Sequence, residues 1–232
     1  MDRVLKSAAM KSARLVVLAA IAVAVVACSE AASVSGRVEF LTRRGQKPNR
    51  AETLVWLDGR SVKPAPPGEF RIATRSKSLI PHVLAIPIGS RVQFPNEDPI
   101  AHNLFSLSSP NQFDLGFYRR GAGKERKFDQ AGLVNIYCNV HPNMSAVIHV
   151  MKTPYFVFAD ESGNFLVPDV SPGDYRVFAW NETGGLAEGN VSIGEGKAVS
   201  GLTLTIDSRR YNPEQHLDKE GKPYSRSNRR DY

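Results

Sequence analysis

The stretch that decides the fold is residues 132–144, which read Gly132-Leu-Val-Asn-Ile-Tyr-Cys138-Asn-Val-His141-Pro-Asn-Met144. Its first half is a short β-type run rich in apolar side chains that ends at a thiol. An imidazole follows three positions after the thiol, and a thioether follows six positions after it. These side chains can converge only if the chain between them forms a tight loop. The stretch therefore predicts a strand that ends in a loop of candidate metal ligands.

A second imidazole lies upstream, in Phe94-Pro-Asn-Glu-Asp-Pro-Ile-Ala-His102-Asn-Leu-Phe-Ser106, just before another predicted strand. Two imidazoles and a thiolate form a trigonal site, and a weak axial thioether makes it a blue-copper electron-transfer centre. The sequence therefore predicts one copper ion bound by His102, Cys138, His141 and Met144. The remaining histidines lie before a strand, within a strand and near the C-terminus, where structural or solvated roles are expected.

The rest of the chain has the pattern of an all-β protein. After residue 33, no long segment shows a sustained period of 3.6 residues, and short β-type runs alternate with Gly, Pro, Asn and Asp. Turn signals about 8–12 residues apart are typical of antiparallel sandwiches and barrels. The strands predicted in the central region are 70–74, 83–87, 91–94, 103–106, 124–128, 132–138 and 146–151.

Two of these motifs together resemble the cupredoxin family, the plastocyanin and amicyanin group of blue copper proteins. His102-Asn-Leu-Phe is similar to the segment around the first histidine ligand of plastocyanin, and Cys138-x-x-His141-Pro-x-Met144 is similar to the short ligand loop of amicyanin. The resemblance implies a Greek-key β-sandwich over residues 68–152 that holds one type 1 copper. It also implies that the side chain of Asn103 hydrogen-bonds the two ligand loops together. Pro142, with its fixed φ, is expected to stiffen the loop.

The sequence around residues 160–177 predicts a second, smaller β-sandwich. Asp160-Glu-Ser-Gly-Asn-Phe and Pro172-Gly-Asp-Tyr resemble hairpin turns of the carboxypeptidase regulatory-like (transthyretin-like) sandwich. The usual start of that module is absent after residue 153, whereas Ser35-Gly-Arg-Val fits it. We therefore expect one sandwich split into 33–67 and 153–207, with the copper domain inserted. The alternative is an irregular N-terminal segment followed by two sequential domains.

The two ends of the chain are basic. Residues 1–27 combine a basic leader with an apolar run of 13 residues, 15–27, which is too short to span a bilayer and predicts a signal peptide. The run ends in Val-Val-Ala-Cys28, which resembles a bacterial lipobox and implies lipidation of Cys28 and anchoring at the outer membrane. Ordinary cleavage after Ala31 is the alternative, and either route exports the chain to the periplasm or cell envelope. Residues 208–232 are predicted to be a basic flexible tail.

The charge pattern and the motifs limit the classes of function that fit the chain. The net charge of +7 arises mostly at the two ends, so it does not indicate nucleic-acid binding. We find no Ser-His-Asp, paired-carboxylate or phosphate-loop pattern and expect no enzyme activity. The leading hypothesis is an exported type 1 copper protein that carries single electrons between a redox protein donor and acceptor. The alternatives are a periplasmic protein that stores or delivers copper, and a structural or adhesion module.

The ligand loop also predicts where electrons leave. His102 precedes a strand and is expected to lie deep in the fold. His141 lies in a loop between Val140 and Pro142 and is expected to reach the surface. Ile100, from the adjoining loop, should extend the same apolar rim. A small apolar rim around an exposed ligand suits the small interfaces of weak redox encounters.

Overall fold

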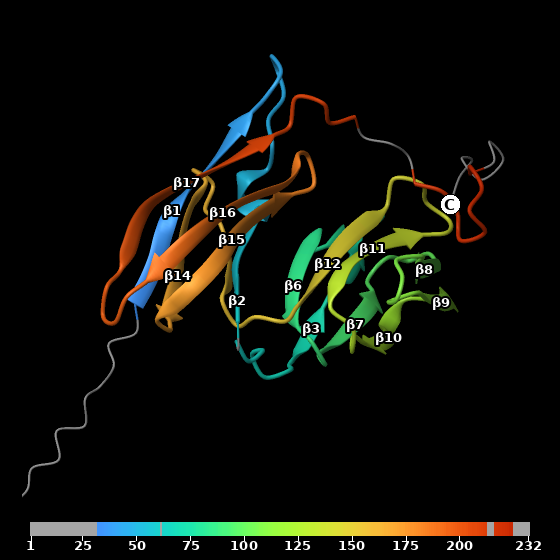
Figure 1. Cartoon of the computed structure of the whole chain (residues 1–232). Helices are drawn as coiled ribbons and strands as arrows, with labels where there is room; N and C mark the ends of the chain where they lie inside the picture. The colour runs from blue at the N-terminus through green and yellow to red at the C-terminus, as the bar shows by residue number, and fades with distance from the viewer. Residues whose placement is uncertain (1–31, 61, 213–215, 225–232) are drawn as a thin grey trace, which may run out of the picture.

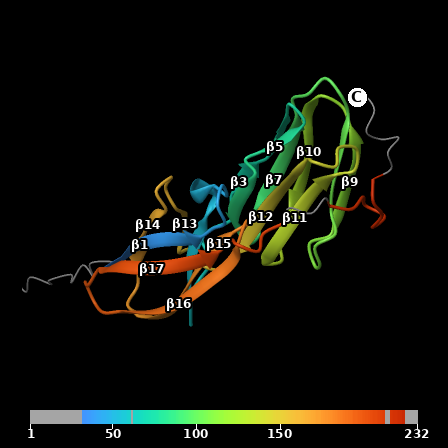
Figure 2. The same ribbon diagram turned by 90° about the horizontal axis from the view of Figure 1, so that it is seen from above.

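The computed structural model describes residues 32–60, 62–212 and 216–224. In these ranges the chain forms seventeen β-strands and one short 3₁₀-helix, Arg50–Glu52. This confirms the predicted all-β class. The strands form two β-sandwiches that lie beside each other along an elongated molecule (Figures 1 and 2). Within the described ranges, no helix has the length and apolar character needed to cross a bilayer.

The first sandwich, here called the outer sandwich, combines strands from both ends of the sequence. Its three-stranded sheet has the order β14 (Asn164–Val170), β1 (Ala32–Leu41), β17 (Val199–Asp207). Its four-stranded sheet has the order β13 (Phe156–Phe158), β2 (Leu54–Gly59), β15 (Gly173–Asn181), β16 (Gly185–Ile193). Strands β1 and β2 therefore lie inside their sheets, each between strands that come after residue 155 in the sequence.

Apolar side chains from alternate positions of these strands form one core. Val34 and Val38 of β1 share a single buried cluster with Val177 of β15 and Ile206 of β17. Gly36 is needed where β1 runs parallel to β17, because a Cβ atom at this position would lie 2.2 Å from the carbonyl oxygen of Leu202. The close pairing of the first and last strands thus depends on a glycine.

The central sandwich is built from residues 69–151. One sheet has the order β10 (Gly121–Lys127), β7 (Arg91–Asn96), β4 (Ala73–Arg75), β5 (Ser78–Ile80), and β3 (Glu69–Arg71) also pairs with β7. The other has the order β6 (Val83–Pro87), β12 (Ser145–Met151), β11 (Gly132–Cys138), β8 (His102–Ser106), β9 (Phe113–Tyr118). A separate buried cluster, which includes Phe94, Leu104, Ile136 and Met144, fills the space between the two sheets.

Strand β9 was not among the predicted strands. Gly116 lies within it at φ 65°, in the left-handed region, and the pairing of β8 with β9 shifts register between Asn103 and Phe105. This irregularity hides the two-residue period on which strand prediction relies. Strand β8 supplies the hydrogen-bonding partners that make the segment a strand.

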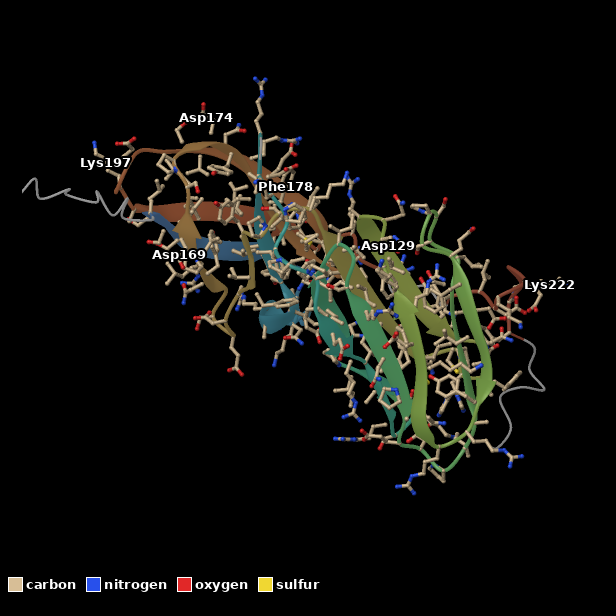
Figure 3. All side chains as sticks on the ribbon, turned by 90° about the horizontal axis from the view of Figure 1, so that it is seen from below. Asp129, Asp169, Asp174, Phe178, Lys197 and Lys222 are labelled. Carbon is tan, nitrogen blue, oxygen red and sulfur yellow. The ribbon has the colours of Figure 1, made fainter. Side chains whose placement is uncertain are left out.

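The two sandwiches touch through aromatic side chains. Met151 of β12 is buried in a small cluster with Leu54 of β2, and Trp56 packs against this cluster. His149 of β12 packs edge-on against Trp180 of β15, with ring centroids 4.3 Å apart. Figure 3 shows Phe178, the stacking partner of Trp56, near the middle of the molecule, whereas Lys197 and Lys222 lie at opposite ends. The contact thus joins the four-stranded sheet of the outer sandwich to β12 of the central sandwich.

The chain after β17 returns to the central sandwich. Residues 216–224, here called the strap, lie beside the end of the central sandwich near β8 and β11 (Figure 1). Tyr224 in the strap is only 9% exposed. The sequence predicts a flexible tail from residue 208, because this segment has no apolar period. The described part of it instead packs through isolated aromatic and polar side chains, which leave no periodic signal.

Candidate metal centre

Three of the four predicted ligands converge at one end of the central sandwich. His102 begins β8, Cys138 ends β11, and His141 lies in the loop between β11 and β12. One ligand atom from each of these three residues lies within 4.8 Å of the others. The Cys138 sulfur lies 3.7 Å from Nδ1 of His102 and 3.6 Å from Nδ1 of His141. Antiparallel pairing of β8 with β11 brings these positions together although 36 residues separate them.

These separations fit a shared metal ion. With bonds of about 2.0 Å to nitrogen and about 2.3 Å to sulfur, ligands at ~120° to each other lie about 3.7 Å apart. Both sulfur–nitrogen distances match this value. The thiol and each imidazole are therefore spaced as two ligands of one metal ion would be. A thiol between two imidazoles is a donor set for a soft or borderline transition metal.

The fourth predicted ligand, Met144, is buried beside this group. It is 1% exposed and belongs to the same core cluster as Cys138. The N–H of Cys138 donates to the carbonyl of Met144 at 3.1 Å, and the N–H of Met144 donates to the carbonyl of His141 at 3.1 Å. These two bonds close the loop and place the thioether residue immediately before β12.

Pro142 occupies the second position of the turn from His141 to Met144. Its fixed φ suits this position, and its missing N–H is not needed there. The proline therefore favours the closed loop that carries two of the candidate ligands.

The ring of His102 is held by a carboxylate that the sequence analysis missed. Nε2 of His102 lies 3.0 Å from Oδ2 of Asp98, and both side chains are buried. Because a carboxylate only accepts hydrogen bonds, Nε2 carries the proton and the lone pair of Nδ1 faces the thiol. The sequence spacing could have indicated this contact, since Asp98 precedes His102 by four residues.

Asp98 is itself fixed by a turn. Burial alone would raise the pKa of its carboxyl, but the N–H groups of Lys77 and Ser76, together with His102, outweigh burial and lower this pKa. Both N–H groups come from the β4–β5 turn, where Ser76 and Lys77 have φ of 52° and 56°. The carboxylate therefore stays charged and connects this turn to the candidate ligand.

His141 is less exposed than the sequence predicts. Its Nε2 atom is buried and has no hydrogen-bond partner among the described residues, although the residue as a whole is half-buried. Burial, and then the proximity of His102, lower the pKa of His141 to about 4. The imidazole is therefore neutral at physiological pH, the form in which a ring nitrogen can bind a metal.

The thiol of Cys138 is fully buried. Burial raises its pKa, and the N–H groups of Val140, Asn103 and His141 act in the opposite direction. Without a metal ion, the buried thiol therefore keeps its proton. Binding of a metal ion releases this proton, because the thiolate is the form that coordinates.

Asn103 does not connect the ligand loops through its side chain, as the resemblance implied. Its Nδ2 donates to Asp114 of β9 at 2.5 Å, and its Oδ1 is buried without a partner among the described residues. The loops are joined by the backbone instead, since the N–H of Asn139 donates to the carbonyl of Asn103 at 2.8 Å. The direction of the side chain depends on β9, which the sequence did not predict.

The remaining candidate, Cys28, lies outside the described residues. Cys138 is the free cysteine of the described part of the chain.

Comparison with known proteins gives matches to parts of the chain. The family model described as polysaccharide lyase family 4, domain II, matches residues 143–200. It is not the carboxypeptidase regulatory-like family that the turn motifs predicted. One predicted turn is present, with the N–H of Gly163 donating to the carbonyl of Asp160 at 2.9 Å. Such turns are set by local chemistry and recur in unrelated sandwiches, so they do not identify a family. No curated protein matches the chain.

Solved structures that resemble part of the chain include cupredoxins. A purple cupredoxin from Nitrosopumilus maritimus is 22% identical, with a TM-score of 0.31 over 35% of this chain and 98% of its own. A reduced Cu(I) form of an amicyanin variant is 16% identical, with a TM-score of 0.34 over 42% of this chain and 98% of its own. A copper-containing nitrite reductase from Thermus scotoductus is 21% identical, with a TM-score of 0.35 over 49% of this chain and 28% of its own.

Proposed function

We propose that this protein is a type 1 copper protein that carries single electrons between redox partners. The observation that carries the proposal is the convergence of two Nδ1 atoms at 3.6 and 3.7 Å from one buried thiol. Sulfur ligands favour Cu(I) and imidazole accommodates Cu(II), so this set suits both oxidation states. His102, Cys138 and His141 would hold the ion, with Met144 as the weak axial ligand. Bound copper would supply a one-electron Cu(II)/Cu(I) couple.

The surroundings of the ligands support a carrier role. The core residues and hydrogen bonds that hold Cys138 and His102 leave these side chains little room to move. A site that keeps one geometry in both oxidation states loses little energy to rearrangement when an electron arrives or leaves. The burial also keeps water away from the thiol.

The same ligand set argues for a carrier and against a substrate-transforming enzyme. Catalytic metal sites keep an open coordination position for water or substrate. Here three donors lie within 4.8 Å of one another, and Met144 in the same buried cluster is available as a fourth. The partners we propose are therefore a donor and an acceptor protein that exchange electrons with the site from the surface.

The direct test of this proposal is the visible spectrum after addition of Cu(II). We expect an intense thiolate-to-copper absorption band at one copper per chain, together with reversible one-electron reduction. Cys138→Ser should abolish the band because the sulfur is the charge-transfer donor, whereas Cys28→Ser, the matched control, should keep it. A wild-type chain that stays colourless with excess Cu(II) would overturn the assignment. A coloured chain that cannot be reduced reversibly would favour copper storage or delivery.

We also propose that the protein acts in the periplasm or cell envelope, tethered through a lipid on Cys28. The support is the Val-Val-Ala-Cys ending of the apolar run in the leader. Each buried CH₂ of an acyl chain adds about 0.8 kcal/mol, so two or more chains anchor a protein stably. Mass spectrometry of the mature N-terminus tests this proposal. An acylated Cys28 supports it, and an unmodified start at Ala32 shows a soluble exported form.

A further inference from the structure

The strap, residues 216–224, reaches the backbone of the ligand cysteine. The hydroxyl of Tyr224 donates a hydrogen bond to the carbonyl of Cys138 at 2.7 Å, and this bond is buried. The two residues are 86 positions apart in the chain. A distant, buried donor to this carbonyl restrains the peptide that follows the thiol.

Lys219 of the strap contacts the ligand loop and strand β9. Its backbone N–H donates to Oδ1 of Asn139 at 3.0 Å, and its ammonium group pairs with Asp114 at 2.9 Å. Asp114 also accepts the side-chain hydrogen bond from Asn103, the residue after the first ligand histidine. The ion pair is partly exposed and therefore weak. The backbone bond to Asn139 is the firmer link between the strap and the loop.

Aromatic contacts complete the attachment. The ring of His216 stacks on Tyr137 with centroids 4.2 Å apart and an interplanar angle of 18°. Tyr224 packs edge-on against His216 at 5.2 Å. The strap thus contacts three consecutive residues, namely the ring of Tyr137, the carbonyl of Cys138 and the amide side chain of Asn139.

We propose that the strap is a structural part of the metal centre and that Tyr224 is a positioning residue for the ligand Cys138. The inference rests on the proposed function for its consequence at the metal, but the contacts themselves do not depend on it. By holding the carbonyl of Cys138 and the side chains of the residues before and after it, the strap would keep the sulfur where both imidazoles can share an ion with it.

Loss of the Tyr224 hydrogen bond should weaken metal binding. Groups that orient metal ligands, without touching the metal, typically change its affinity 10–100-fold when removed. Tyr224→Phe removes only the hydroxyl and keeps the ring that packs on His216. We expect the variant to lose copper to a chelator about tenfold faster than the wild type. Its thiolate-to-copper band should also shift, because the sulfur is oriented less firmly.

Backbone hydrogen exchange in the full, metal-free chain tests the positioning role of Tyr224. In Tyr224→Phe, amides of residues 137–141 should exchange severalfold faster, while those of β1 and β17 keep their wild-type rates. Tyr211→Phe is the matched control, because Tyr211 lies on the same C-terminal segment outside the strap. We expect this control to retain both the wild-type exchange and the wild-type copper release.

The outcomes separate this inference from the proposed function. Unchanged exchange in residues 137–141 would overturn the positioning role, whether or not the chain binds copper. Faster exchange throughout the central sandwich would also overturn it, because that result indicates general destabilisation. If the wild type binds no copper, the proposed function fails, and the exchange measurement still decides whether the strap restrains the loop.

Discussion

Asp98 accepts a hydrogen bond from Nε2 of His102 at 3.0 Å, and this contact fixes which nitrogen of the histidine faces the thiol. The same carboxylate accepts N–H groups of Ser76 and Lys77 from the β4–β5 turn. The orientation of the first candidate ligand is therefore set by a turn in the opposite sheet of the central sandwich.

Replacing this carboxylate should weaken metal binding. In Asp98→Asn, the amide keeps the shape of the side chain but loses the charge that holds the Nε2 proton of His102. We expect copper affinity to fall about tenfold, as for other partners of metal-bound histidines. Competition with a chelator measures this change. Glu97→Gln is the control, because Glu97 pairs with Arg71 and Arg75 outside the site. Equal affinities for both variants would contradict the role of Asp98.

Met144→Leu should keep the copper and change its reduction potential. Leucine has nearly the same volume as methionine, so the buried site should lose less than about 1.5 kcal/mol of stability. The axial ligand tunes the potential of such a site, so removing the thioether should shift the potential. Cyclic voltammetry measures the change. A potential equal to that of the wild type would show that the thioether does not act on the metal.

Stability should fall in acid because of His149. Burial lowers its pKa from 6.5 to about 4, so between these values the unfolded chain binds a proton that the folded chain does not. The free energy of unfolding therefore decreases as pH falls through this window. Near pH 4.5, the loss from this residue is about 2 to 3 kcal/mol. The His149→Phe variant should not show this loss. At pH 4.5 it should therefore keep more of its neutral-pH stability than the wild type does.

Urea unfolding of the metal-free chain at pH 7 and pH 4.5 tests this prediction. The two tryptophans of the chain, Trp56 and Trp180, both pack beside His149, so their fluorescence reports on this contact. Equal losses of stability for wild type and variant would show that His149 does not titrate as its burial implies.

A charge beside the loop should slow electron exchange. Ile100 is half-buried in the loop before β8, near the segment that holds Asp98 and His102. In Ile100→Lys, a partner that docks on this rim must desolvate an ammonium group, so stopped-flow rates with an acceptor should fall while the absorption spectrum is unchanged. Leu166→Lys is the control, since Leu166 is 57% exposed on β14 of the outer sandwich. Equal rates for both variants would show that electrons leave the protein by a route away from Ile100.

The outer sandwich should fold as one unit although its sequence is split. A chain that joins 33–67 to 153–207 through a short linker keeps β1 and β2, which lie inside the two sheets. We expect a cooperative thermal transition for this chain. Residues 153–207 alone lack an inner strand in each sheet and should remain unfolded. If the shorter chain folds and the joined chain does not, two sequential domains describe the protein better.

The sequence by itself determined the strand period, the all-β class and the candidate ligands His102, Cys138, His141 and Met144. These features are local, because residue type, spacing and alternation along a few residues specify them. The turn from His141 to Met144 is of this kind, since Pro142 presets its geometry.

Only the tertiary structure decided how those ligands are supported. Asp98 acts through a turn from another sheet, Asn103 turns toward the unpredicted strand β9, and Tyr224 reaches Cys138 from 86 residues away. Contacts of this kind leave no period in the sequence, because single side chains make them after distant segments have packed. The partner of a buried polar group is fixed by what the fold brings within hydrogen-bonding distance, and the neighbouring sequence does not specify it.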